Sequence, residues 1–169
     1  MSIKEKRRRL YEEILKRHGQ DILTSDKYGK TSEFIQHGNV SVLEHSLLVA
    51  KYSIALNRRF KIKCNERNLV RGALLHDYFL YDWHDYNSEG NEHPRLHGFY
   101  HPGIALKNAK RDFELNEIEM EIIRKHMWPL TIIPPRCREA WVVTMADKYT
   151  SLLETLGVNK GKGKAFKYA

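Results

Sequence analysis

Five residues that can bind a metal ion stand where the surrounding pattern favours an apolar side chain. They fall on the inward faces of four predicted helices, and they are His45, His76, Asp77, His126 and Asp147. A carboxylate or an imidazole buried without a partner costs several kcal/mol or changes its protonation state. A shared metal ion is the simplest common way to satisfy all five, so we expect a metal site.

The spacing of the neighbouring apolar residues supports burial. His45 is in step with one face of a helix over residues 42–56, a face made by Leu48, Val49, Tyr52 and Leu56. The segment RNLVRGALLHDYF aligns His76 and Asp77 in the same way, and similar patterns precede His126 and Asp147. A lone histidine on an apolar face is more often a satisfied core residue. Accidents on four helices, two of them involving carboxylates, explain the whole set less well.

Five sequence blocks resemble the HD-domain superfamily of metal-dependent phosphohydrolases in its longer form. They follow the family's order between residues 40 and 155, and they are SVLEHSLLVAKYSIAL, LLHDYFLYD, HPGIAL, RKHMW and VVTMADKYTSLLE. A His-Asp pair alone is a weak signal, whereas the ordered set is specific. The layout is similar to that of the bacterial HD family that hydrolyses dinucleoside tetraphosphates.

The resemblance implies a ligand set and a catalytic residue. One divalent metal would be held by His45, His76, Asp77 and Asp147, and Asp77, the catalytic residue, would bridge to a second metal held by His101 and His126. Two metals per chain are expected, iron first, with Mn, Ni, Co, Zn or Mg as alternatives that a His and Asp set also accepts. His101, which precedes Pro102 at the expected entrance of a helix, has His97 as a competitor.

Two departures from the family argue against particular activities. Met127 follows His126, so the paired histidines of cyclic-dinucleotide phosphodiesterases are missing. Leu80 and Tyr81 stand where alarmone hydrolases carry a Glu-Asp pair, and 5′-deoxynucleotidases also carry a Glu at the position of Leu80.

The elements that would position these residues are helices. With 169 residues, 41% of them hydrophobic, we expect an all-α fold, a compact HD-domain helical bundle of about six to eight helices. It would span residues 1–156 as one domain, with its core over 40–155, an N-terminal basic helix over 2–19 and a flexible basic tail over 157–169. Asn116 and Glu119 predict a helix start, and Gly157 predicts a helix end.

Composition bounds the setting of the protein. The sequence shows neither a signal-peptide pattern nor an apolar run long enough for a membrane span, so we expect a cytoplasmic protein. Cys64 and Cys137 are far apart, so we expect free thiols. The net charge of +8 favours anionic partners. The basic ends could grip nucleic acid, or simply be solvated. The sequence does not fix the oligomeric state.

Substrate contacts are expected from cations and from a loop. Residues 81–101 show no helical period and are rich in aromatic, acidic and histidine residues, so we expect a lid over the metals. The candidate substrate-binding residues are Lys148, Arg124, Arg136, Arg138, Trp83 and His97.

The leading hypothesis is a phosphohydrolase that uses a metal-bound hydroxide on a nucleotide or another small phosphate ester or anhydride. A mixed-valent di-iron oxygenase could use the same ligands. A module that binds RNA or a partner and keeps a structural metal site is a further alternative. Motifs of serine hydrolases, zincins, P-loop proteins and dinucleotide-binding folds are absent from the sequence.

Overall fold

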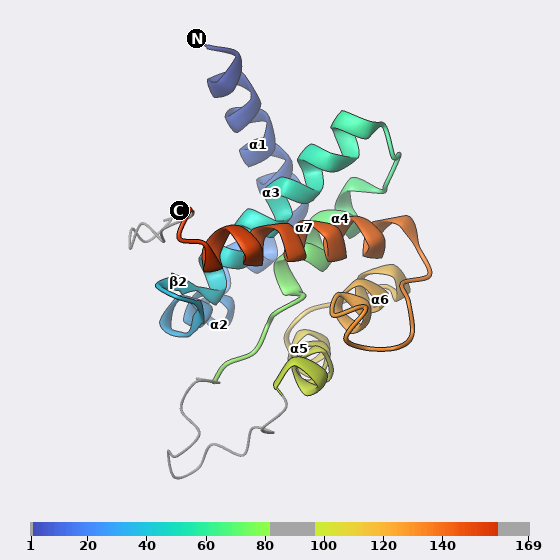
Figure 1. The fold of residues 1–169 in the computed structure, drawn as a ribbon. Helices are drawn as coiled ribbons and strands as arrows, with labels where there is room; N and C mark the ends of the chain where they lie inside the picture. Colours follow the sequence, from blue (N-terminus) through green and yellow to red (C-terminus); the bar gives the residue numbers. More distant parts are fainter. Residues whose placement is uncertain (1, 82–96, 159–169) are drawn as a thin grey trace.

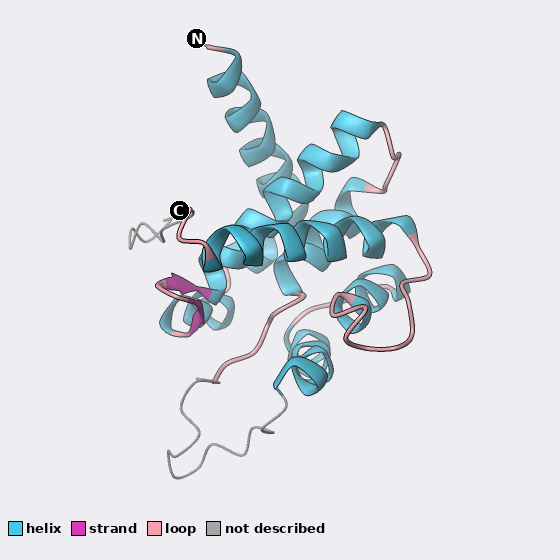
Figure 2. Cartoon of the chain, viewed as in Figure 1, coloured by secondary structure: helices cyan, strands magenta, loops and turns pink. Residues whose placement is uncertain are grey.

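Helices make up most of the structure. The computed structural model describes residues 2–81 and 97–158, with His97 described by its backbone only (Figure 1, Figure 2). Over these residues the α-helices are α1 (Ile3–Leu23), α2 (Asp26–Gly29), α3 (Val42–Phe60), α4 (Glu66–Leu75), α5 (His97–Asp112), α6 (Glu117–Lys125) and α7 (Arg138–Thr155). A 3-10 turn, η1 (Lys30–Glu33), leads into a small antiparallel hairpin of β1 (Ile35–His37) and β2 (Val40–Ser41). The predicted all-α bundle is confirmed, with this hairpin as an addition.

Local sequence determines where the main helices begin. α1, α3 and α6 each start with a capping box, in which a polar side chain and a glutamate three residues later satisfy each other's backbone N–H groups. The predicted pair is one of them, because Asn116 Oδ1 accepts from the Glu119 N–H at 3.0 Å. The predicted stop after α7 is also present, and Gly157 adopts a positive φ of 68° there.

α1 is longer than the predicted helix over residues 2–19. Ser2 lies just outside it as the N-cap, and the helix continues to Leu23. Its last turn is held by burial of Ile22, while Leu23 packs against the same core. The predicted range covered the basic, exposed start of the helix. The helix extends further because its last turn packs against the core.

α4 lies at the centre of the molecule and packs against α1, α3, α6 and α7. Every residue from Asn68 to Leu75 is buried, so the helix is covered on all sides. α7 crosses in front of α3 and α4, and α5 and α6 lie together on one side of it (Figure 1). No helix within the described ranges is long and apolar enough to cross a membrane.

Three of the predicted ligands lie at helix ends, which corrects their placement within helices. α4 ends at Leu75 and α6 at Lys125, so His76 and His126 are C-cap residues and Asp77 lies just beyond. Each of the two rings bonds through Nδ1 to a carbonyl oxygen three residues earlier, at 2.7 Å and 2.8 Å. These carbonyls lack helical partners at a C-terminus, and the imidazoles satisfy them.

His101, in contrast, lies deeper inside a helix than predicted. α5 begins at His97, so His101 lies one turn inside the helix instead of at its entrance. Pro102 follows in the second turn of α5, where its missing backbone N–H removes one helical hydrogen bond. The structure does not describe residues 82–96 or the side chain of His97. The predictions for Trp83, for His97 and for the centre of the proposed lid fall on these residues.

Candidate metal centre

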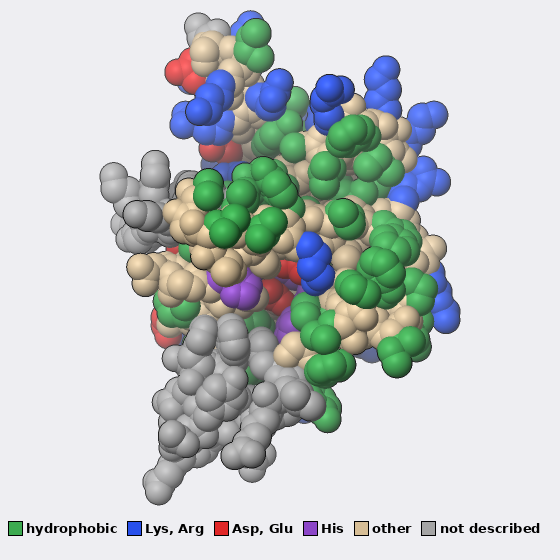
Figure 3. Space-filling view, in the orientation of Figure 1, with side chains coloured by type: hydrophobic (Ala, Val, Ile, Leu, Met, Phe, Trp, Pro, Cys, Tyr) green, Lys and Arg blue, Asp and Glu red, His purple; other side chains and the backbone are tan. Residues whose placement is uncertain are grey.

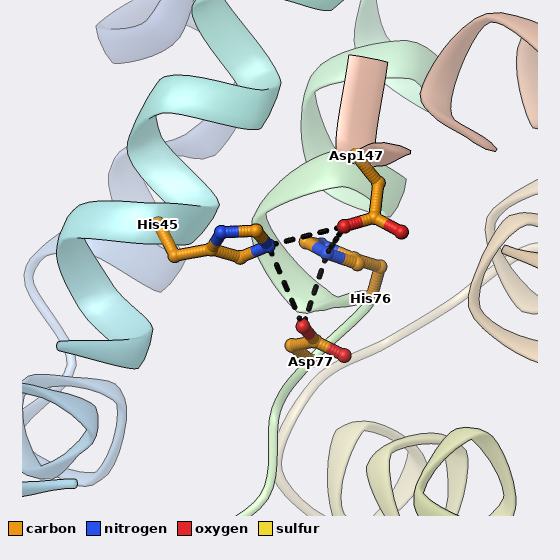
Figure 4. A group of neighbouring side chains, drawn as sticks. All are labelled: His45, His76, Asp77 and Asp147. Carbon is orange, nitrogen blue, oxygen red and sulfur yellow. Dashed lines mark ion pairs between the residues drawn. The ribbon is translucent and has the colours of Figure 1, made fainter. Parts of the chain in front are cut away.

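Four buried side chains from three parts of the fold converge on one point. His45 comes from α3, His76 and Asp77 follow α4, and Asp147 comes from α7 (Figure 4). His45 Nε2 is 3.2 Å from Asp147 Oδ1 and 3.6 Å from Asp77 Oδ2, and His76 Nε2 is 3.3 Å from Asp77 Oδ2 and 3.7 Å from Asp147 Oδ1. Atoms placed tetrahedrally at roughly 2.1 Å around one ion would be roughly 3.4 Å apart. The four atoms therefore have the spacing of a ligand set.

A second group lies on the other side of Asp77. His101 from α5 and His126 at the end of α6 bring their Nε2 atoms to 3.0 Å and 3.3 Å from Asp77 Oδ1. The two Nε2 atoms are 2.7 Å from each other. All three residues are buried, and their ligand atoms form a further set that could hold a metal.

Asp77 belongs to both groups through different oxygens. Its Oδ2 faces His45 and His76, while its Oδ1 faces His101 and His126. A carboxylate in this orientation can serve two cations at once. All six predicted ligand residues are thus brought together around this one side chain.

Hydrogen bonds at Nδ1 of three rings turn Nε2 of each ring toward the cluster. Nδ1 of His76 and of His126 donates to a backbone carbonyl, and Nδ1 of His45 lies 2.8 Å from Glu154 Oε2. A neutral imidazole that donates from Nδ1 carries its lone pair on Nε2. Partners of this kind fix the tautomer and orientation of metal-binding histidines.

Buried polar atoms without hydrogen bonds mark the same point. His45 Nε2, His76 Nε2 and Asp77 Oδ1 are fully buried and have no hydrogen-bond partner in the described part of the chain. Leaving such atoms unsatisfied costs about 1–3 kcal/mol each. A divalent cation would satisfy all three at once, so the residues present fit a metal ion.

The electrostatics of the cluster call for positive charge. Burial alone would lower the pKa of His45 and of His76, but Asp147, Glu154 and Asp77 outweigh it and raise these values to about 9 and about 10. Burial likewise favours neutral acids, yet the histidines hold the pKa of Asp77 and of Asp147 well below the usual range. The carboxylates therefore stay charged and favour positive charge beside them, held either by a proton on each imidazole or by a metal ion that replaces these protons.

Lys148 is the predicted substrate residue that lies beside the cluster. Its Nζ is 3.2 Å from Asp147 Oδ2 and donates to the carbonyl oxygen of His126 at 3.3 Å. Its side chain is 40% exposed, so the ammonium group lies between the cluster and solvent. Figure 3 shows histidine and carboxylate atoms in a hollow of this face, with a basic side chain next to them.

The three predicted arginines lie elsewhere. Arg138 donates to the carbonyl oxygens of Ile62 and Lys63, and it stands nine residues before Asp147, about 13 Å along the same helix. Arg136 is exposed on the approach to α7, where its backbone N–H bonds to Glu121. Arg124 is exposed on α6 and lines a surface hollow with Phe99 and Ile132. Within the described ranges, none of the three forms a hydrogen bond or ion pair with a ligand residue, and their roles in substrate binding stay predictions.

Two residues of the site escaped the sequence reasoning. Glu154 is buried on α7 and bonds to His45, and it stands seven residues after Asp147, which is two turns along the same face. Gln36 is buried on β1 and donates to Asp77 Oδ2 at 2.6 Å. The helical period could have revealed Glu154, whereas nothing local indicated Gln36.

A comparison with protein-family models decides the family. The model described as HD domain matches residues 42–152, which is most of the chain and includes all six ligand residues. The chain belongs to the HD domain family. Comparison with curated proteins found no match, and neither did comparison with solved structures. HD domains are mostly metal-dependent hydrolases of the phosphohydrolase superfamily, and the two ligand groups around Asp77 are consistent with that chemistry.

Proposed function

We propose that this HD domain is a phosphohydrolase that uses two metal ions to cleave a small phosphate ester or anhydride, with nucleotides as its substrate class. The observation that carries the proposal is the position of Asp77, whose Oδ2 faces a group of two histidines and an aspartate and whose Oδ1 faces a group of two histidines. A pair of metals bridged by one carboxylate is a common arrangement in phosphoryl-transfer enzymes.

The roles of the residues follow from this geometry. His45, His76 and Asp147 would hold one metal, His101 and His126 the other, and Asp77 both. When bound, the metals would lower the pKa of water toward neutrality and polarise the phosphoryl group. Because the ligand side chains are buried, they are held in place before the substrate arrives.

Lys148 supplies the charge to orient the phosphate. An ammonium group has three donors, and Lys148 uses them on Asp147, on the carbonyl of His126 and, more weakly, on the sulfur of Met127 at 3.8 Å. The weakest of these bonds can be exchanged for a phosphoryl oxygen. We therefore assign Lys148 to substrate positioning.

Exposed aromatic surface beside a ligand residue supports a nucleotide over a purely aliphatic phosphate. Phe99 and Tyr100 lie two residues and one residue before His101 and are 49% and 52% exposed, so aromatic surface is present next to a ligand residue. Base stacking on such surface is worth about 1–3 kcal/mol in nucleic-acid binders. The net charge of +8 also favours an anionic ligand.

The test is phosphate release from a panel of nucleoside mono-, di- and triphosphates and dinucleoside polyphosphates, run under nitrogen with Mn²⁺ or Fe²⁺. We expect turnover, and we expect Asp77→Ala to abolish it. In Lys148→Ala, KM should rise more than kcat falls. The matched control is Lys110→Ala, which changes an exposed lysine far from the cluster. Product formation that requires O₂ would support an oxygenase instead. RNA binding that survives His76→Ala, without any turnover, would support a binding module.

A further inference from the structure

The hairpin before α3 buries a polar residue and exposes an apolar one. Alternate residues of a strand face opposite sides, and the apolar side normally faces the core. In β1 the order is reversed, because Ile35 is 36% exposed while Gln36 is only 6% exposed. A buried amide is unfavourable unless it makes strong hydrogen bonds. The position therefore serves something other than apolar packing.

An irregularity in the pairing directs Gln36 inward. Ile35 pairs with Ser41 and His37 pairs with Val40, so two steps along β1 correspond to one step along β2. Gln36 is the extra residue of this bulge. β-Bulges re-aim a side chain and are frequent next to active sites.

The amide of Gln36 reaches the shared ligand directly. Nε2 donates to Asp77 Oδ2 at 2.6 Å, and both side chains are buried. A carboxylate can only accept here, so the amide nitrogen and not the oxygen must face Asp77. Oε1 of Gln36 has no hydrogen-bond partner in the part of the chain that is described. Among the described residues, the side-chain bond to Asp77 is what accounts for burying this glutamine.

We propose that Gln36 is a positioning residue that fixes the carboxylate plane of Asp77. Its bond holds Oδ2 toward His45 and His76, and this leaves Oδ1 toward His101 and His126. Without it, the carboxylate could rotate and present both oxygens to one metal. Gln36 precedes the segment that matches the HD domain, which begins at residue 42. The inference rests on the metal-binding part of the proposed function and not on the identity of the substrate.

The test is a Mn²⁺ titration of Gln36→Met, which keeps a side chain of similar length and removes the donor. Affinity is measured by competition with a chelator, and spin-coupled Mn²⁺ pairs are followed by electron paramagnetic resonance. We expect the dissociation constant to rise about 10–100-fold and the coupled signal to fall. Ile35→Thr, a change in the same strand that does not touch Asp77, is the control and should bind like the wild type.

A Gln36→Met protein with wild-type affinity and coupled signal would overturn the proposal. If that variant does not fold, Gln36→Asn keeps the amide but withdraws it by one methylene, and we expect the same direction of change. A wild type that binds Mn²⁺ pairs but releases no phosphate would contradict the proposed function and leave this test intact. A wild type that binds no metal would contradict both.

Discussion

At the scale of single residues, the cluster depends on partners that are not ligands themselves. Glu154 Oε2 accepts from His45 Nδ1 at 2.8 Å, and Ser151 Oγ donates to Asp147 Oδ1 at 3.3 Å. Both come from α7, where Ser151 lies one turn and Glu154 two turns beyond Asp147. They keep the ligand atoms of His45 and Asp147 aimed at one point.

Removing the Glu154 carboxylate should therefore weaken metal binding without removing a ligand. For Glu154→Ala we expect metal affinity to fall about 10–100-fold, because His45 loses the group that fixes its tautomer and ring orientation. Metal titration of the purified variant measures this. Thr155→Ala, an exposed change on the same helix, should have no effect. Equal metal affinities for the two variants would show that Glu154 does not support the metal site.

Prediction from the sequence worked best where a residue's role follows from helical spacing. His45 and Asp147 could be assigned to buried faces because their own helices carry the apolar period. The turn geometry of His76, Asp77 and His126 was not predicted, since it depends on side-chain bonds to helix-end carbonyls. Gln36 could not be found because its bulge exists only once β1 and β2 have paired.

At the scale of elements, close approach of α4 and α6 brings the two ligand groups together. α4 leads into His76 and α6 into His126, and Gly72 of α4 lies against Ile122 of α6. A Cβ at position 72 would lie 2.8 Å from Ile122 Cγ2 and 2.9 Å from its Cβ. Atoms so near the backbone cannot move aside without moving the helix.

Gly72→Ala should separate these helices. We expect it to destabilise the protein by about 1–3 kcal/mol, as overpacking of a core does, and to weaken metal binding. Chemical denaturation followed by circular dichroism measures the first effect. Gly103→Ala is the matched control, because nothing lies within 4 Å of a Cβ there and α5 should gain up to about 1 kcal/mol. A neutral Gly72→Ala would show that the contact between α4 and α6 is not tight.

α5 is tied to the rest of the fold by a buried carboxylate at its C-terminus. Asp112 accepts from Lys27 at 2.6 Å and from the Tyr78 hydroxyl at 3.1 Å. Arg111 first, and then Lys27 and Tyr78, hold the pKa of Asp112 well below the usual range of an aspartate. A lowered folded-state pKa gives stability that is present above the unfolded pKa and lost as pH falls through the folded pKa.

Asp112→Asn should remove that contribution. At pH 7 we expect a loss of about 1–3 kcal/mol in the free energy of unfolding. The difference from the wild type should shrink as the pH falls below about 4 and toward the folded pKa of Asp112. Denaturation at several pH values tests this, with the exposed Glu13→Gln as control. A difference that stays constant between pH 7 and pH 3 would contradict the assignment.

The helix boundaries show the same division between local and long-range causes. The start of α6 was predictable, because Asn116 and Glu119 form a capping box from four consecutive residues. The end of α1 was not, because it depends on burial of Ile22 against distant elements. The bundle as a whole was predictable from apolar periodicity and from the ordered histidine and aspartate blocks.

At the scale of the whole molecule, the centre links five helices. Its ligands lie on α3, α5 and α7 and at the ends of α4 and α6. Metal that binds only the folded state should therefore stabilise the entire bundle. At free metal 100-fold above its dissociation constant, the gain is about 2.7 kcal/mol.

Removal of metal by a chelator should accordingly lower the melting temperature, and adding Mn²⁺ should restore it. Thermal unfolding followed by circular dichroism measures both changes. The Asp77→Ala protein, which lacks the shared ligand, should respond to neither treatment. A wild type that melts at one temperature with and without metal would contradict a folded-state metal centre.

The most direct test of the account is the number of metal ions per chain, measured by elemental analysis after loading with Fe²⁺ or Mn²⁺ under nitrogen. If Asp77 bridges two positions, the wild type should hold about two ions, His101→Ala about one and Asp77→Ala close to none. An Asp77→Ala protein that keeps one or both ions, or a wild type that holds no ion, would contradict the shared carboxylate as the centre of this site.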